Sequence, residues 1–208
     1  MDIAIPLYDR FTALDAVGPY EVLWRLPGAR VHWIAAEARP YGTDRGLKLV
    51  ADETFDDVPA PDVVVVPGGT GTLAALEDER LVDWIRGAAA TAAWTTSVCT
   101  GALLLGAAGV LDGLRATTHW AYMDRLADYG AEGTADRVVE QGRIITSAGV
   151  SSGIDMALVL AARIAGDVVA QAIQLRIEYD AEPPFDTGSL AKAPARIVDL
   201  AQSPTPAA

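Results

Sequence analysis

Residues 92–105 read Ala-Ala-Trp-Thr-Thr-Ser-Val-Cys-Thr-Gly-Ala-Leu-Leu-Leu, and they contain the only cysteine of the chain, Cys99. A β-prone run ends at Val98 and an Ala/Leu-rich helical run starts at Thr100, so the pattern predicts a sharp strand-to-helix turn at Cys99. The flanking residues are small, as such a turn requires where neighbouring backbone passes close by. The N–H groups and positive dipole end of the helix favour a thiolate here.

Cys99 also has a simpler interpretation. A lone cysteine is most often a small buried hydrophobe, and the packing of a strand against a helix selects small residues as well. This stretch alone leaves a reactive thiol and a core residue as alternatives, so the rest of the chain has to decide between them.

Short apolar, β-branched runs alternate with longer Ala/Leu-rich segments, which is typical of strands joined by crossover helices. Residues 63–66 are four valines, so we expect a central strand covered by helices on both faces. A hairpin with Gly142 in its turn is expected over 138–145. The chain therefore predicts an α/β three-layer sandwich with a mostly parallel sheet. Its expected strands are 3–7, 31–36, 47–51, 63–66, 93–98 and 144–147, and its expected helices 19–25, 72–76, 81–90, 100–108, 122–129, 151–164 and 168–179.

Composition limits the classes of function. At 208 residues the chain suits one domain, which can bury about 70% of the surface of its unfolded chain. The net charge of −12, from 16 basic and 28 acidic residues, repels phosphate backbones and anionic lipids, so neither nucleic acid nor a membrane is an expected partner. The single cysteine and the two histidines, His32 and His119, lack metal-ligand spacing, so no metal is predicted. Without an apolar run near ~20 residues or a signal-peptide pattern, we expect a cytoplasmic protein.

Open α/β sheets place their sites at the carboxyl ends of the strands, and three loops are expected there beside Cys99. The first, residues 67–72, contains Gly68 and Gly69, whose exposed N–H groups suit an oxyanion hole; a flexible turn is the alternative. A formal dinucleotide-binding fingerprint in this loop does not indicate a cofactor, because Pro67 interrupts the tight turn that such a site needs.

The second loop, residues 12–21, contains Asp15 near the start of the first predicted helix. Its carboxylate either caps the helix or, if it approaches Cys99, holds a proton or positions water for acid–base chemistry. Glu21 is a second acidic candidate, which helical spacing turns to another face. The two roles of Asp15 are both open at this point.

The third loop, residues 148–155, contains Gly149, which permits close backbone approach, and Ser151 and Ser152, either of which we expect to cap the following helix. His119 is the one obvious imidazole base for Cys99, with a structural histidine as the alternative. His32 lies inside a predicted strand and is expected to be structural.

Five short motifs carry a likeness to a known family: Ser-Val-Cys-Thr-Gly-Ala (97–102), Ala-Thr-Thr-His-Trp (116–120), Gly-Val-Ser-Ser-Gly-Ile-Asp (149–155), Leu-Arg-Ile-Glu-Tyr (175–179) and Pro-Pro-Phe-Asp (183–186). Together they resemble the DJ-1/PfpI (ThiJ) superfamily, and within it the isonitrile hydratases. The likeness runs from Ile3 to about Ser189. It implies one class I glutamine amidotransferase-like domain over residues 1–190. The segment 191–208 then ends in a tail, 203–208, whose composition predicts disorder.

The resemblance implies a flavodoxin-like fold and a homodimer, with Cys99 as nucleophile and Asp15 as its acidic partner. It also implies that Thr100 assists through its hydroxyl and its N–H, and that Gly69 offers an oxyanion-type amide. Gly68, Gly149 and His119 are further candidates for the pocket. The proline-rich segment 182–186 is expected to run as an extended arm, either over a partner subunit or over its own domain.

Two positions distinguish branches of this superfamily. Thr100 stands where PfpI-type proteases carry histidine, which argues against a peptidase. Asp15 stands where DJ-1 and many relatives use glutamate, which fits the isonitrile hydratases. The resemblance therefore implies a hydro-lyase that hydrates small organic isonitriles to N-substituted formamides through a covalent thioimidate on Cys99, without a cofactor. The alternatives are a ligand- or redox-sensing module like the sensor domains of AraC-type regulators, and glyoxalase-like chemistry.

Overall fold

A central sheet of seven strands organises the computed structural model, which describes residues 1–203. The strand order is β10-β11-β7-β6-β1-β2-β5, and every neighbouring pair is parallel except β10 with β11. The predicted mostly parallel, flavodoxin-like α/β fold is confirmed. The strands are β1 (Asp2–Pro6), β2 (Arg30–Ala35), β5 (Glu53–Thr54), β6 (Val63–Val66), β7 (Trp94–Val98), β10 (Val138–Gln141) and β11 (Ile144–Ser147).

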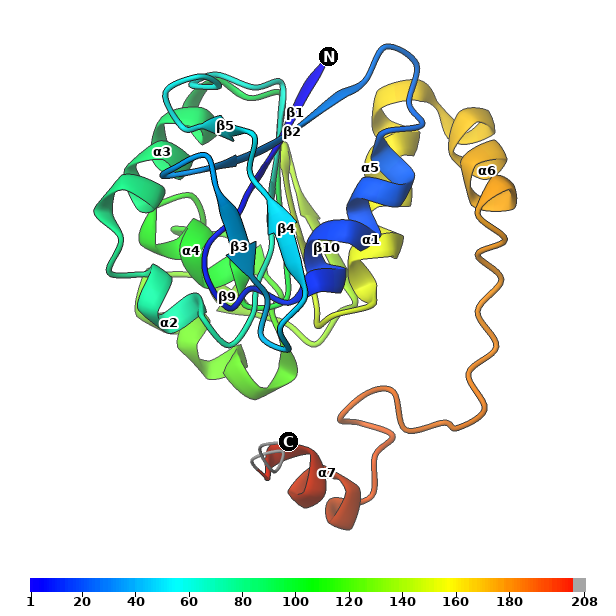
Figure 1. The fold of residues 1–208 in the computed structure, drawn as a ribbon. Coiled ribbons are helices and arrows are strands. Elements are labelled where there is room, and N and C mark those ends of the chain that lie inside the picture. Colours follow the sequence, from blue (N-terminus) through cyan, green and yellow to red (C-terminus); the bar gives the residue numbers. More distant parts are fainter. Residues whose placement is uncertain (204–208) are drawn as a thin grey trace.

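Helices cover both faces of this sheet (Figure 1). One face carries α1 (Ala13–Leu23) and α5 (Ser152–Ala165), with α6 (Asp167–Arg176) packed on α5. The other face carries α2 (Thr72–Ala75), α3 (Glu79–Thr91), α4 (Gly101–Ala107) and the 3₁₀ helix η1 (Trp120–Tyr129). The four valines of β6 are fully buried, as expected for a central strand between two helical layers.

Two small two-stranded sheets lie outside the main sheet. β3 (Pro40–Gly42) pairs antiparallel with β4 (Lys48–Val50), and β8 (Arg115–Ala116) pairs parallel with β9 (Glu132–Gly133). The strand expected over 47–51 is therefore β4, which does not join the main sheet. Leu47, just before this strand, and Val50, at its end, are about half exposed.

The first helix starts earlier than its proline predicts. We expected residues 19–25, with Pro19 in the first turn, but α1 begins at Ala13 and Pro19 lies in its interior. The proline cannot donate to the carbonyl of Asp15, yet close packing against α5 keeps the helix intact: Gly18 lies against Ile154 and Gly153 against the Pro19 ring. Tertiary contact thus outweighs local propensity here.

The chain leaves the body of the domain after α6. Residues 177–194 run away from it, and α7 (Ala195–Gln202), a helix that the sequence pattern did not predict, has no buried residue (Figure 1). Apart from Ser203, the tail predicted to be disordered lies outside the described residues. Over residues 1–203, no helix is long and apolar enough to span a membrane.

Two glycines test how tightly the α4 layer packs. A Cβ on Gly101 would overlap the carbonyl oxygen of Val66, whereas a Cβ on Gly87, in the exposed face of α3, would meet nothing within 4 Å. We expect Gly101→Ala to lower the free energy of unfolding by more than about 2 kcal/mol, because α4 has to shift away from β6. Gly87→Ala should raise it by about 0.5–1 kcal/mol through helix propensity. Urea unfolding measures both, and equal effects would contradict the packing described here.

Candidate active site

Cys99 occupies a strained strand-to-helix turn between β7 and α4. Its φ of 58° is in the left-handed region, which costs a non-glycine residue about 1–2 kcal/mol. Surrounding loops hold the turn in place. The Cys99 N–H donates to the carbonyls of Ser147 (3.1 Å) and Ala148 (3.0 Å), and the Thr118 hydroxyl donates to the Cys99 carbonyl (2.8 Å). Cys99 is only 5% exposed, so its thiol is buried.

The carboxyl group of Asp15, on α1, lies beside Cys99. Asp15 is fully buried, and its Oδ2 accepts the Gly68 N–H at 3.0 Å while Oδ1 has no hydrogen-bond partner. It makes no capping bond to its own helix, whose N-cap is Thr12. The helix-cap interpretation is therefore wrong, because the carboxyl bridges to the loop after β6 and faces Cys99.

Burial controls the protonation of this pair. Desolvation raises the pKa of Asp15 from 3.8 to about 7, against the opposing effects of the Gly68 amide and the Cys99 thiol. Burial likewise raises the pKa of Cys99, and the charge of Asp15 raises it further, while the N–H and hydroxyl of Thr100 lower it. The expectation of a resting thiolate stays a prediction: burial and Asp15 oppose it, and Thr100 at the start of α4 favours it.

Thr100, the N-cap residue of α4, links the thiol to the loop after β6. Its buried hydroxyl accepts the Gly69 N–H at 2.9 Å. Gly69 has a φ of 151°, and a Cβ there would collide with the backbone of Phe11. The structure thus brings Gly69 and Thr100 together, with the Gly69 amide directed at the Thr100 oxygen. Their roles toward an oxyanion stay predictions.

Gly68 lies directly above the start of α4. A Cβ on Gly68 would approach the Thr100 hydroxyl to 2.6 Å and the Gly101 amide to 2.8 Å. Only a glycine allows the loops after β6 and β7 to meet backbone to backbone here. This contact delivers the Gly68 amide to Asp15 beside Cys99.

His119 and Gly149 are neighbours at the entrance to η1. A Cβ on Gly149 would lie 3.3 Å from His119 Nε2, and His119 Nδ1 accepts the Ala121 N–H at 3.3 Å. Burial lowers the pKa of His119, and the rings of Trp120 and Tyr122 flank it. No contact joins its ring to the thiol, so His119 as a base for Cys99 stays a hypothesis.

Three further candidates, Glu21, Ser151 and Ser152, make contacts with groups other than Cys99. Glu21 is exposed and pairs with Arg25 at 2.8 Å. Ser151 is the N-cap residue of α5, as expected, but its side chain makes no capping hydrogen bond and accepts one from Arg137 instead. The Ser152 hydroxyl donates to the Ala148 carbonyl.

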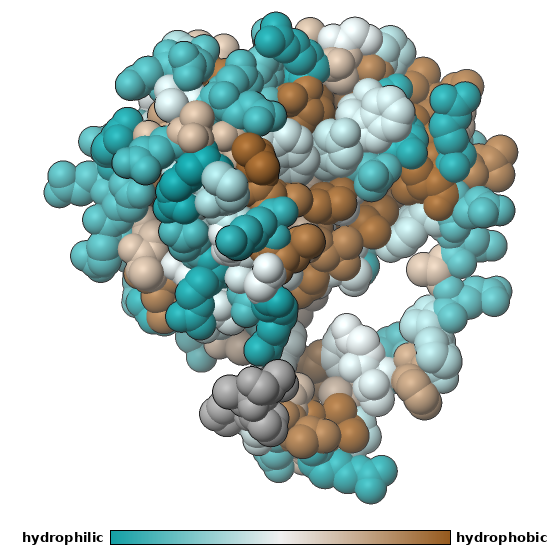
Figure 2. Space-filling model, in the orientation of Figure 1, coloured by the Kyte–Doolittle hydropathy of each residue, from teal (hydrophilic) through white to brown (hydrophobic). Residues whose placement is uncertain are grey.

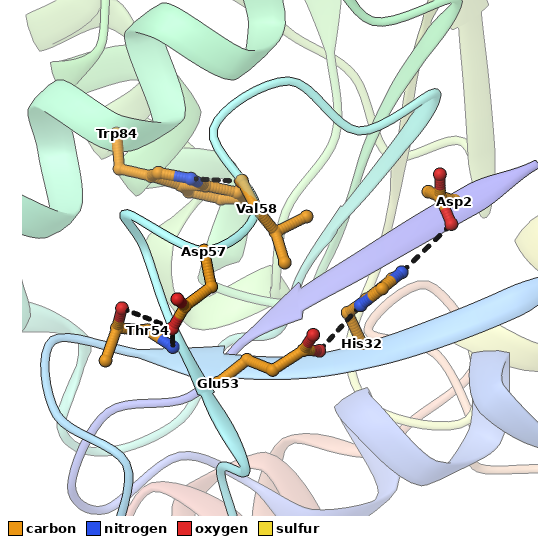
Figure 3. A network of polar contacts seen from close by, with 7 residues as sticks. All are labelled: Asp2, His32, Glu53, Thr54, Asp57, Val58 and Trp84. Carbon is orange, nitrogen blue, oxygen red and sulfur yellow. Dashed lines mark hydrogen bonds and ion pairs between the residues drawn. The ribbon is translucent and has the colours of Figure 1, made fainter.

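His32 is structural, as expected. It bridges Glu53 (Nδ1 to Oε2, 2.6 Å) and Asp2 (Nε2 to Oδ1, 3.0 Å) and so ties β1, β2 and the edge strand β5 together (Figure 3). Asp2 begins its strand, which puts this network at the amino-terminal edge of the sheet, opposite Cys99. Within residues 1–203 no group of three or more His, Cys, Asp or Glu side chains is arranged to hold a metal ion.

The DJ-1/PfpI family model matches residues 1–163. The chain belongs to the DJ-1/PfpI family. An isonitrile hydratase from Pseudomonas putida is 47% identical over 202 residues, which cover 97% of this chain and 89% of that protein. A ThiJ/PfpI family protein from Pseudomonas syringae has a similar structure, with a TM-score of 0.93 and 40% identity over 96% of this chain and 84% of that one. The transcriptional regulator GbdR of Pseudomonas aeruginosa is 30% identical over 86% of this chain but only 50% of its own length.

The geometry suits nucleophilic addition in this DJ-1/PfpI chain. Cys99 offers a thiol, and Asp15, with a pKa near 7, exchanges a proton close to neutral pH, where general acid–base catalysis is most effective. The N–H and hydroxyl of Thr100 act as donors toward the sulfur and lower the pKa of the thiol. Sequence patterns did not single out Tyr8 or Thr118, because their contacts with this site join residues far apart in the chain.

Asp15 should leave a signature in the pH dependence of stability. Its folded-state pKa is raised, so the folded chain holds a proton that the unfolded chain releases between about pH 4 and pH 7. The free energy of unfolding should therefore fall across this window, by up to about 4 kcal/mol from this group. Asp15→Asn does not titrate, so its stability relative to wild type should rise over the same window.

Urea unfolding at a series of pH values tests this. Asp83→Asn, a substitution on the surface of α3, is the matched control and should keep the wild-type trend. A difference between Asp15→Asn and wild type that is independent of pH would show that the carboxyl is ionised in the folded chain.

Proposed function

We propose that this chain hydrates small organic isonitriles to N-substituted formamides as a cytoplasmic hydro-lyase, with Cys99 as nucleophile and Asp15 as the group that moves protons. The observation that carries the proposal is the buried pair of Cys99 and Asp15, with Thr100 following the cysteine. The identity of 47% to an isonitrile hydratase over nearly the whole chain supports it.

The proposed reaction begins with transfer of the Cys99 proton to the Asp15 carboxylate. The thiolate forms a C–S bond to the terminal isonitrile carbon, and Asp15 returns the proton to that carbon, which gives a thioimidate. Water then adds to the same carbon with Asp15 as base, and the nitrogen takes up a proton. Breaking the C–S bond releases the formamide and regenerates the thiol. Isonitrile and water are consumed in equal amounts, and no electrons are exchanged.

The environment of Asp15 supports both of its proposed roles. A carboxyl with a pKa of about 7 is populated in both forms near neutral pH, so it accepts the thiol proton and delivers it again without a large energetic cost. Its unpartnered Oδ1 is the free atom for this transfer, because Oδ2 is held by Gly68. Thr100 is the proposed donor to negative charge that develops on the substrate or on sulfur, with Gly69 as a second amide.

A turnover assay with a simple aliphatic isonitrile tests the proposal. We expect formamide, detected by proton NMR, from the wild-type chain. Cys99→Ala should abolish turnover, Asp15→Asn should reduce it at least about 10²-fold, and Thr100→Val should reduce it about 10-fold or more. Glu21→Gln, which changes an exposed carboxylate of the same helix, is the control and should act like wild type. No formamide from the wild-type chain, or undiminished turnover by Cys99→Ala, contradicts the proposal.

Assays on the same purified protein distinguish isonitrile hydration from two other functions. A redox- or ligand-sensing module is suggested by the likeness to GbdR, of which the chain covers about half. Such a module would oxidise at Cys99 under mild peroxide without turning over an isonitrile. A glyoxalase-like enzyme would instead convert methylglyoxal to lactate.

A homodimer remains part of the proposal, and the C-terminal arm supports it. Residues 180–203 expose Phe185, Leu190 and Leu200, while α6 exposes Val168 and Leu175. Figure 2 shows apolar side chains gathered on the side of the body that carries α1, α5 and α6, and others on the arm. In a dimer of this chain, the apolar side chains of the arm and those of the body would both be covered, because the arm of one copy reaches beyond its own domain.

Light scattering after size exclusion measures the assembly directly. The full chain should have the mass of two copies, and a variant that ends at Tyr179 should dissociate at a higher concentration than the full chain. A full chain with the mass of one copy at all concentrations would contradict the homodimer.

A further inference from the structure

The backbone of Cys99 is held from both sides, and one of the groups that hold it is a side chain with no part in the proposed reaction. On the amino side, the Cys99 N–H donates to the carbonyls of Ser147, the last residue of β11, and Ala148. On the carboxyl side, the Thr118 hydroxyl donates to the Cys99 carbonyl at 2.8 Å. Thr118 is fully buried, so water does not compete for this bond.

These bonds fix both backbone dihedrals of the nucleophile candidate. The direction of the Cys99 N–H sets φ, and the direction of its carbonyl sets ψ. A φ of 58° is unfavourable for a residue with a side chain and persists only where the surroundings enforce it. The cost of this strain is similar in size to the net contribution of one buried hydrogen bond, so loss of a single bond is enough to let the turn relax.

The helix that follows Cys99 is a poor substitute for Thr118. Its first available donor to the Cys99 carbonyl, the Ala102 N–H, lies 3.4 Å away, beyond the usual range of an N–H···O bond. Without the Thr118 hydroxyl the carbonyl would be buried with only this long contact, which is costly. The Thr118 bond is therefore the main constraint on the Cys99 carbonyl.

The segment that carries Thr118 is itself tied to the sheet. Thr118 lies between β8 and η1, and the N–H of the preceding residue, Thr117, donates to the Thr146 hydroxyl at 2.9 Å. Thr146 is on β11, which pairs with β7, the strand that ends just before Cys99. On its other side, η1 packs against α4. Thr118 thus contacts Cys99 from a segment fixed to the same strands and helix that form the turn.

We propose that Thr118 is a positioning residue for the proposed reaction: its hydroxyl holds the Cys99 carbonyl, keeps the turn in its left-handed conformation, and so directs the sulfur toward Asp15 and Thr100. Thr118 acts only through the backbone of Cys99. When the turn relaxes, rotation about φ and ψ carries the Cys99 side chain away from both partners. This inference rests on the proposed role of Cys99 as nucleophile, but the conformation of the turn is measurable without turnover.

Nuclear magnetic resonance of Cys99 tests the proposal directly. The chain has one cysteine, so incorporation of ¹³C-labelled cysteine gives signals from this residue alone, and its Cα and Cβ chemical shifts depend on φ and ψ. Thr118→Val keeps the shape of the side chain and removes the donor, so both shifts should change. Thr118→Ser keeps the donor and should restore the wild-type shifts.

Thr96→Val is the matched control. Thr96 is equally buried, lies on β7, and also donates its hydroxyl to a carbonyl, that of Val64 at 3.0 Å. Its loss should destabilise the chain about as much as Thr118→Val does, because each substitution removes one buried hydroxyl-to-carbonyl bond. The Cys99 shifts should stay at their wild-type values in Thr96→Val, which separates control of the turn from a general loss of stability.

The pH profile of Cys99 labelling by iodoacetamide is a second readout. In Thr118→Val the displaced sulfur loses part of its stabilisation by the Thr100 N–H and hydroxyl, so the rising limb of the profile should move to higher pH by about one unit. Asp15 faces the sulfur from α1 and Tyr8 from the loop after β1, and both stay in place in this variant. Thr118→Ser and Thr96→Val should label like wild type.

Isonitrile turnover adds a third readout if the proposed function holds. Thr118→Val should lower kcat about 10-fold or more and leave KM nearly unchanged, because a misdirected thiol raises the barrier to attack and leaves substrate binding intact. Thr118→Ser should keep most of the activity.

Wild-type Cys99 shifts together with a wild-type labelling profile in Thr118→Val would overturn the proposal. Changes of equal size in Thr96→Val, or a Thr118→Ser variant that behaves like Thr118→Val, would overturn it as well. If Thr118→Val does not fold, as judged by circular dichroism, Thr118→Ala takes its place. A chain that fails to hydrate isonitriles would refute the proposed function, while the shifts and the labelling profile would still decide the role of Thr118.

Discussion

The hydrogen bond from the Gly68 amide to the buried Asp15 carboxyl, 3.0 Å long, is the contact on which the rest of the site depends. It joins the start of α1 to the loop after β6, and that loop touches the turn of Cys99 because Gly68 and Gly101 lack side chains. Three neighbouring strands, β1, β6 and β7, thus deliver an acid, an amide and a thiol to one edge of the sheet.

Burying this arrangement has electrostatic consequences. Both groups are buried, so the charged forms of Asp15 and Cys99 are disfavoured. The charge of Asp15 further raises the cost of ionising Cys99, whereas the Cys99 thiol favours the charged form of Asp15. The pair therefore titrates as a unit. Asp15 gains or loses its proton near neutral pH, so transfer of that proton is the step by which we propose that the Cys99 thiol is activated.

The sequence predicted the parts of this structure that local patterns encode. Four valines indicated the central strand, and small residues around Cys99 indicated the turn. The role of Asp15 stayed open, because the sequence around a helix-capping aspartate does not differ from that around an aspartate that faces a thiol. The predicted start of α1 was wrong, because packing of Gly18 and Pro19 against α5 allows a proline inside the helix rather than in its first turn. The hydrogen bonds that join the hydroxyls of Tyr8, Thr72 and Thr100 could not be predicted, since these residues are 64 and 28 positions apart in the chain.

The proposed hydration depends on a covalent bond between the substrate and Cys99. The most direct measurement is rapid quenching of the wild-type chain with an aliphatic isonitrile, followed by mass spectrometry of the intact protein and of the peptide that contains Cys99. We expect a transient adduct on Cys99 with the mass of one isonitrile, which disappears as formamide accumulates. Formamide that accumulates at full rate while Cys99 stays unmodified at every time point would contradict it.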